Sequence, residues 1–115
     1  MKPQRMIEIA HALACNKAYP RQTHRLVAVG IRGEDGVLVS SCNGYPSEPS
    51  WASHAETKLI RKLTPDSVVA VVRILRDHSL AMAKPCNSCE KLLKRAGIKR
   101  VHYSITDNEF GTIIF

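Results

Sequence analysis

Two short motifs contain the residues of this sequence that could do chemistry. His-Ala-Glu at 54–56 places an imidazole and a carboxylate two residues apart, and Cys86-x-x-Cys89 places two thiols three residues apart. Zinc prefers imidazole and thiolate ligands, and a catalytic zinc site has three protein ligands and a fourth position open to water. We therefore predict a Zn²⁺ site whose ligands are His54, Cys86 and Cys89.

Glu56 follows the predicted ligand His54 by two residues, so its carboxylate can lie beside the water that zinc activates. Zinc lowers the pKa of such a water to about 7, and a neighbouring carboxylate can take and return the proton. In a second interpretation, His54 and Glu56 are ordinary helix-surface residues and Ser53 forms a capping box with Glu56. In a third, the zinc is structural and Cys15 or Cys42 is its fourth ligand, an arrangement that has no use for Glu56.

The apolar pattern predicts the elements that position these motifs. The predicted helices cover residues 3–18, 53–63 and 86–96, the predicted strands 25–32, 37–42, 67–75, 99–105 and 112–115, and the predicted loops 43–52 and 77–85. Glycines supply the turn in Gly-Glu-Asp-Gly at 33–36, and Gly97 ends the last helix. This order predicts a three-layer α/β/α sandwich around a five-stranded mixed sheet.

Two features of the topology follow from this order. The two helices that carry the motifs begin at the sheet edge where strands end, which brings His54 close to the two cysteines. The connection from Ile105 to Thr112 is too short for a parallel crossover, which needs a dozen or more residues. If the last strand pairs with the one before it, the pairing is therefore antiparallel.

Length and composition limit the class of protein. The 115 residues and 12.8 kDa predict one domain over 1–115, and the 44% apolar and 23% charged residues are typical of a folded chain. We expect no membrane span and, without a signal peptide, a cytoplasmic location, where Cys-x-x-Cys favours metal binding over disulfides. The net charge of +7 indicates an anionic partner or a solvated basic surface.

His-Ala-Glu at 54–56, followed by Pro-Cys-Asn-Ser-Cys at 85–89, resembles the signature of the zinc-dependent cytidine and deoxycytidylate deaminase superfamily. The resemblance covers nearly the whole chain in the order of its elements, and the C-terminal half looks most like small deaminase-like proteins of phages and bacteria. It implies that an activated water attacks C4 of cytosine or C6 of adenine. Glu56 would protonate the ring nitrogen and then the leaving amine, so that ammonia departs.

The resemblance also implies residues that contact the substrate. The backbone amide of Ala55 would meet the carbonyl oxygen of the base, and Asn43 would contact a sugar hydroxyl unless it is only a turn former. Trp51 either walls the base pocket by stacking or anchors its loop. Tyr103 either flanks the pocket or belongs to the core.

A histidine ligand is typical of the deoxycytidylate, tRNA-adenosine and polynucleotide branches, whereas an antiparallel last strand is typical of the free-cytidine branch. We predict hydrolytic deamination of cytosine in a free nucleoside or nucleotide, by a homo-oligomer in which a second copy completes the cleft. One alternative is a deaminase of cytosine or adenine in single-stranded DNA or RNA. Another is a non-catalytic zinc module.

The remaining basic residues have simpler interpretations. The segment with Lys17, Arg21 and Arg25 could hold a phosphate, but a solvated basic face is the other interpretation. The other histidines have no partner at metal-binding spacing and are expected on the surface or in a hydrogen-bonded core. These histidines are His11, His24, His78 and His102.

Overall fold

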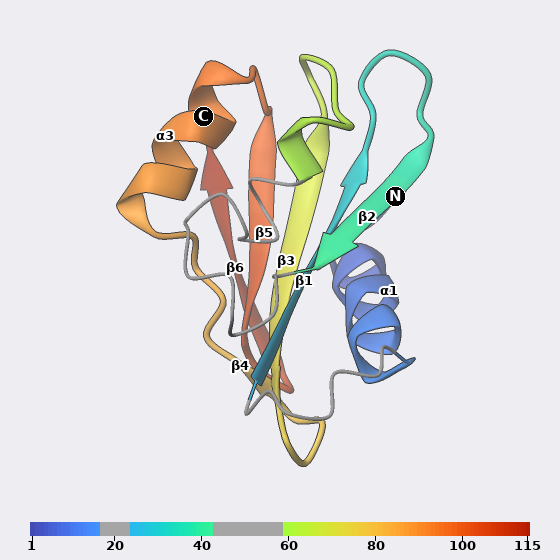
Figure 1. The fold of residues 1–115 in the computed structure, drawn as a ribbon, viewed down its shortest axis with the longest axis vertical. Helices are drawn as coiled ribbons and strands as arrows, with labels where there is room; N and C mark the ends of the chain where they lie inside the picture. Colours follow the sequence, from blue (N-terminus) through green and yellow to red (C-terminus); the bar gives the residue numbers. More distant parts are fainter. Residues whose placement is uncertain (17–23, 43–58) are drawn as a thin grey trace.

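The structure is a computed structural model, and it describes residues 1–16, 24–42 and 59–115 (Figure 1). The helices and strands are α1 (Pro3–Asn16), β1 (His24–Ile31), β2 (Leu38–Cys42), β3 (Val68–Leu75), β4 (Leu80–Ala81), α3 (Asn87–Arg95), β5 (Arg100–Thr106) and β6 (Glu109–Ile114). Residues 59–60 are also helical. They belong to the predicted helix 53–63, the start of which lies outside the described residues.

The strands form one mixed sheet. Five of them lie in the order β2-β1-β3-β5-β6, and the short β4 pairs with β3. β1 is antiparallel to both of its neighbours, β3 and β5 are parallel, and β5 and β6 are antiparallel. The predicted mixed sheet and its antiparallel last strand are therefore confirmed.

Helices cover both faces of this sheet, with α1 on one side and α3 on the other (Figure 1). Successive side chains of a strand point to opposite faces, so a central strand needs apolar residues at nearly every position. In β3, Val72 packs into the core under α1, whereas Val71 packs into the core under α3. Both side chains are fully buried. The three predicted layers are confirmed.

The C-terminal hairpin departs from the predicted boundaries. β6 begins at Glu109 rather than at residue 112, because the turn needs only Asp107 and Asn108. Gly111, which had indicated a turn, lies within the strand and pairs with Tyr103, whose ring a Cβ added at Gly111 would meet. A glycine under an aromatic ring is therefore a packing position here and not a turn position.

The predicted loop 77–85 contains β4, which the sequence interpretation missed. The backbone N–H of Leu80 donates to Oδ1 of Asp107 at 2.7 Å, and the hydroxyl of Ser104 donates to the carbonyl of Ala81 at 2.7 Å. Two residues are too few to show strand periodicity, so the strand is recognised only from its antiparallel pairing with β3.

The turn between β1 and β2 uses its two glycines differently. Gly36 has φ of +73°, the conformation for which glycine is favoured, and it confirms the prediction. Gly33 instead allows a close approach, because a Cβ there would lie 2.1 Å from the carbonyl oxygen of Pro65. Its N–H donates to Oγ of Ser67 at 2.9 Å, so the turn is fastened to the start of β3.

None of the helices that the structure describes is long and apolar enough to cross a membrane.

Candidate zinc-binding site

The N-terminus of α3 positions the two cysteines of the second motif. Cys86 is the N-cap residue, with φ −66° and ψ 164°, and its carbonyl accepts the N–H of Glu90 at 2.8 Å. The Cys86 side chain is exposed, makes no capping hydrogen bond and forms no disulfide. Cys89 lies in the first turn and is 1% exposed. One thiol therefore faces outward and the other inward on a single helical turn.

The sequence places this turn by making α3 amphipathic and by ending it sharply. Leu93 and Ile98 are buried in the core on the α3 side, whereas the remaining α3 surface carries lysines and Arg95. Gly97 has φ of +79° and its N–H donates to the carbonyl of Lys94 at 3.1 Å, as expected of a helix that glycine ends. The predicted stop at Gly97 is confirmed.

Backbone hydrogen bonds fix both ends of the α3 segment to the sheet. The N–H of Ala83, just before the cysteines, donates to the carbonyl of Ser104 near the end of β5 at 2.9 Å. The N–H of Lys99, just after α3, donates to the carbonyl of Ser67 at the start of β3 at 2.8 Å. The helix therefore begins at the sheet edge where β3 and β5 end, as predicted.

The donor set of this turn fits zinc in part. Cys86 and Cys89 offer two sulfur atoms from one turn, which is the spacing that zinc sites use. In the part of the chain that the structure describes, no group of three or more His, Cys, Asp or Glu side chains could hold a metal ion. A third ligand must therefore come from elsewhere. The predicted site residues His54, Ala55, Glu56, Asn43 and Trp51 lie outside the described residues.

The two other cysteines bear on the alternative of a closed structural zinc. Cys15 and Cys42 both pack against the core under α1. Cys42 pairs across the sheet with Val27, which belongs to that same core. The sheet therefore separates both thiols from α3, and this separation argues against either as a fourth ligand beside Cys89.

Tyr103 lies on the face of the sheet that α3 covers. It packs against the core on that side, and its ring lies over Gly111 of the neighbouring strand. The side chain is half-buried. A core position is thus part of its role, and its contact with a substrate stays a prediction.

The histidines that the sequence predicts as surface or hydrogen-bonded core residues behave accordingly where they are described. Nε2 of His11 donates to the carbonyl of His78 at 2.7 Å, and His78 itself is exposed. His102 is 3% exposed, and its Nδ1 lies 2.8 Å from the hydroxyl of Thr112. Burial, followed by the nearby charge of Arg100, lowers the pKa of His102 below its ordinary value of 6.5.

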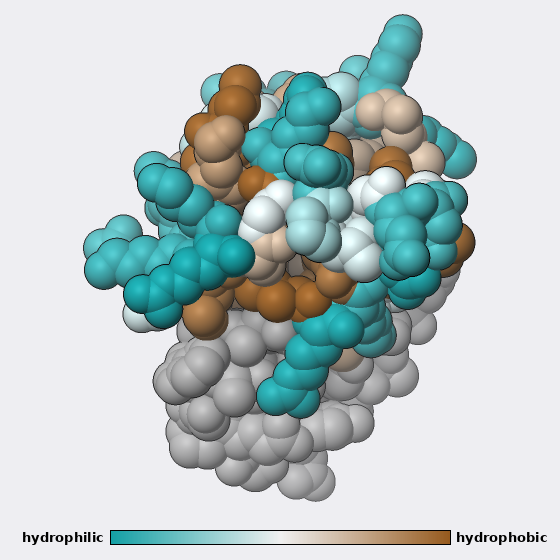
Figure 2. All heavy atoms as spheres, turned by 90° about the horizontal axis from the view of Figure 1, so that it is seen from above, coloured by the Kyte–Doolittle hydropathy of each residue, from teal (hydrophilic) through white to brown (hydrophobic). Residues whose placement is uncertain are grey.

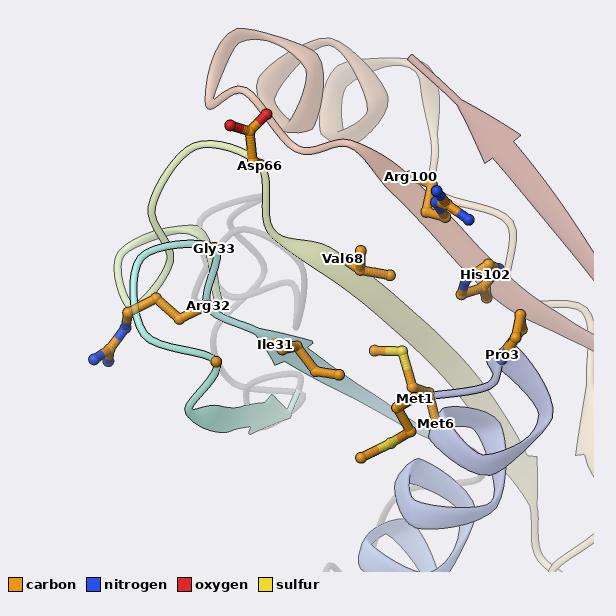
Figure 3. Close-up of a pocket in the computed structure, with 11 residues that line it drawn as sticks. Met1, Pro3, Met6, Ile31, Arg32, Gly33, Asp66, Val68, Arg100 and His102 are labelled. Atoms are coloured by element: carbon orange, nitrogen blue, oxygen red, sulfur yellow. The ribbon is translucent and has the colours of Figure 1, made fainter.

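Sequence reasoning missed two arginines with unusual surroundings. The Nε atoms of Arg73 and Arg100 are buried and have no hydrogen-bond partner within residues 1–16, 24–42 and 59–115. Arg73 interrupts the apolar run of β3, a signal that the sequence offered, whereas Arg100 follows Lys99 and looks like an ordinary surface cation. Arg73 pairs with Leu26 on the α3 face, and Arg100 lines a pocket at the opposite end of the sheet (Figure 3).

The fold is that of solved cytidine deaminases. The cytidine deaminase from Burkholderia pseudomallei superposes with a TM-score of 0.76 at 18% identity, covering 99% of this chain and 93% of that one. That from Mycobacterium leprae gives 0.63 at 20% identity, with 97% and 93% covered. That from Mycobacterium tuberculosis gives 0.55 at 16% identity, with 90% and 85% covered. No curated protein sequence matches the chain.

The sequence relationship is more specific than the shared fold. Residues 1–105 match the family model described as the cytidine and deoxycytidylate deaminase zinc-binding region. The chain therefore belongs to this family, as its two motifs predicted. Membership makes it a deaminase of the cytidine type, with zinc as the family's cofactor.

Proposed function

We propose that the protein removes the amino group of cytosine by hydrolysis in a free nucleoside or nucleotide. The observation that supports this proposal best is the family match together with the two cysteines at the start of α3. The antiparallel β6 favours a free substrate, because this ending is typical of the free-cytidine branch that the chain resembles. We further propose that one domain over residues 1–115 carries the whole site.

Three side chains would hold the metal in this proposal: His54 from the first motif and the Cys86 and Cys89 thiolates from the second. Zinc, when bound there, would make a water molecule nucleophilic at neutral pH. The exposed thiol of Cys86 suits this role because neither a cap nor a disulfide occupies it. The buried Cys89 would fix the ion against the body of α3.

Glu56 would move the protons of the reaction. It would take one proton from the attacking water and deliver it to N3 of the ring, and then move the second proton, from the hydroxyl now on C4, to the amino group. A C4–O bond forms, the C4–N bond breaks, and ammonia leaves with the proton that it needs. The product carries a carbonyl where the amine stood.

The remaining predicted residues would orient the base and its sugar. The backbone N–H of Ala55 would donate to the carbonyl oxygen of the base, and Asn43 would bind a sugar hydroxyl. Trp51 and Tyr103 would flank the ring. Of these, Tyr103 is described, and its place on the α3 face is compatible with the role.

The proposal includes a homo-oligomer. Phe110 is 41% exposed and Ile114 is 77% exposed, and both lie on β6. Among the described strands β6 pairs only with β5, so it is a sheet edge, which a stable protein usually covers or protects. A second copy that packs on β6 would bury both side chains. The cytoplasmic location stays a prediction.

Replacing Glu56 with Gln tests the proposed function. The Glu56→Gln variant should bind zinc as the unchanged protein does, because Glu56 is not a ligand. Its rate should fall by about 10²- to 10⁴-fold, the usual contribution of a general acid–base group. Ammonia release and product mass would be followed with cytidine, deoxycytidine, their monophosphates and short oligonucleotides. If the unchanged protein releases no ammonia from any of these substrates, the result supports the alternative of a non-catalytic zinc module.

One observation favours the alternative of a single-stranded nucleic acid substrate. The segment around the cysteines exposes five cations, and Figure 2 shows hydrophilic side chains projecting on the side where α3 lies. These cations are Lys84, Lys91, Lys94, Arg95 and Lys99. Binding through several phosphates weakens steeply as salt rises. A steep salt dependence of deamination, seen with oligonucleotides and absent with a mononucleotide, would support this alternative.

A further inference from the structure

A pocket of about 410 Å³ lies at the end of the sheet opposite the cysteines (Figure 3). It is lined by the first turn of α1, the end of β1, and the first residues of β3 and β5, namely Val68 and Arg100. The turn that carries Cys86 and Cys89, here called the cysteine turn, follows a segment bonded near the opposite end of β5, where the N–H of Ala83 donates to the carbonyl of Ser104. Volumes above about 300 Å³ are typical of sites for small ligands.

Arg100 gives this pocket a positive charge that the described protein does not neutralise. Among the described residues, its buried Nε has no hydrogen-bond partner and no ion pair joins Arg100 to a carboxylate. A buried donor left without an acceptor costs about 1–3 kcal/mol, and more when the group is charged. Native proteins rarely leave such a group unpaired unless water, an ion or a ligand completes it.

The neighbouring charged groups do not supply the missing partner. Arg32 is already engaged, with Nη1 bonded to Asp35 at 3.1 Å and Nε bonded to the carbonyl of Lys62 at 3.0 Å, and Figure 3 shows it pointing away from the pocket. Asp66 also lines the pocket, and no ion pair joins it to Arg100 in the described part of the chain. Within the described residues, the buried Nε of Arg100 is therefore left for water or a ligand.

His102 follows Arg100 by two residues on β5, so the two side chains lie on the same face of the sheet (Figure 3). Its burial, followed by the charge of Arg100, lowers its pKa, which favours the uncharged imidazole. Its Nδ1 is held by Thr112, so the ring has a fixed orientation. The pocket thus joins one guanidinium to one neutral polar ring.

The remaining wall contains apolar side chains together with Arg32, Asp66 and two glycines. Met6 is fully buried, and Ile31 and Val68 pack against the core under α1. The first turn of α1 contains no acidic residue that would repel an anion. A ligand that matches this wall has an apolar body as well as a negative group.

We propose that this pocket binds a small organic anion. Its phosphate or carboxylate pairs with the guanidinium of Arg100, and its apolar body lies against Met6, Ile31 and Val68. The ligand class follows from one unpaired cation, one fixed imidazole and an aliphatic wall within a single cavity. The site is separate from the cysteine turn, so its occupancy does not depend on the deamination proposed above.

The first experiment uses the zinc-loaded protein without substitution. The Nε–Hε signals of arginine would be followed by ¹⁵N NMR during titration with phenyl phosphate, benzoate, inorganic phosphate and phenol. The Arg100 signal should move and saturate with phenyl phosphate or benzoate at lower concentration than with inorganic phosphate, because only the former two have an apolar body. Phenol should leave it unchanged. The buried Nε of Arg73, on the α3 face, is an internal control that should not respond.

Two matched variants supply the second experiment. Arg100→Gln should weaken binding of the better aromatic anion by about ten- to hundredfold, the loss of one charge-assisted hydrogen bond. Arg73→Gln should leave that binding unchanged. Melting temperatures would verify that both variants fold. If one of them does not fold, the NMR titration of the unchanged protein tests the proposal by itself.

Several results would overturn the proposal. One is an Arg100 signal that stays still with both aromatic anions, and another is a signal that phenol moves as much as they do. Equal weakening in the two variants would mean a general charge effect. If the signal changes with protein concentration in the absence of any anion, a second copy of the chain occupies the pocket instead.

Discussion

The two ends of the central strands β3 and β5 differ in how their chemistry is encoded. Where the strands end, the cysteines come three residues apart from one short motif, and a single helical turn presents both. Where the strands begin, Arg100 and His102 meet Met6 and Ile31, residues that lie far apart in the sequence. A motif can be recognised without a fold, whereas a pocket assembled from distant segments cannot. Substitutions at these two ends, or on the two faces of the sheet, should therefore have different effects.

The largest effect is expected at the cysteine turn. Cys89→Ser should remove one zinc ligand, so deamination should become undetectable. Loss of a residue that only supports a ligand lowers metal affinity by roughly 10- to 100-fold, and loss of the ligand itself should lower zinc affinity by more. Elemental analysis and ammonia release measure both. Cys15→Ser is the matched control, because Cys15 packs on the α1 face and its substitution should leave the zinc content unchanged. Loss of zinc in the control would revive the closed structural site.

The next effect compares the two faces of the sheet. Met6 under α1 and Leu93 under α3 are both fully buried, so Met6→Ala and Leu93→Ala should each lower the free energy of unfolding by about 2–5 kcal/mol. Chemical denaturation would measure the loss. Only Leu93→Ala should also weaken zinc binding, because Leu93 seats the helix that carries the cysteines. Equal zinc affinity in the two variants would show that the α3 packing does not control the metal site.

The smallest effect is a pH dependence at the Arg100 end. Burial and the charge of Arg100 hold the pKa of His102 below its unfolded value near 6.5, so the folded protein binds fewer protons there than the unfolded chain. Stability should therefore be complete above about pH 6.5 and should decrease as the pH falls below that value. The His102→Gln variant should show a flatter profile in urea unfolding between about pH 7.5 and pH 5. An unchanged slope would contradict the buried, neutral imidazole.

Two carboxylates titrate in a lower pH range and do not interfere with this measurement. Hydrogen bonds from the hydroxyl and N–H of Ser79 lower the pKa of Asp77, and the N–H of Val37 followed by Arg32 lowers that of Asp35. Both pKa values are below the ordinary 3.8. Their contribution is present above that value and is lost only as the pH falls through the still lower folded pKa values.

Much of the fold could be predicted because its signals are local. Apolar runs gave β1, β3 and β5 to within a residue or two, and Gly97 marked the end of α3. The direction of β6 followed from chain length alone, since a turn of two residues cannot cross over a sheet. β4 and the start of β6 were missed because pairing with a neighbouring strand, β3 for β4 and β5 for β6, decides them.

For the candidate site, the sequence by itself determined the donor types, their spacing and the family, because ligand chemistry depends on side-chain identity. His54 and Glu56 keep their roles as predictions, since they lie outside the described residues. Only the tertiary structure decided which face of the sheet each cysteine occupies, and it separated Cys15 and Cys42 from Cys89. It alone brought Arg100 to an apolar wall, because a strand's register and its neighbours, and not its own residues, determine what a side chain meets.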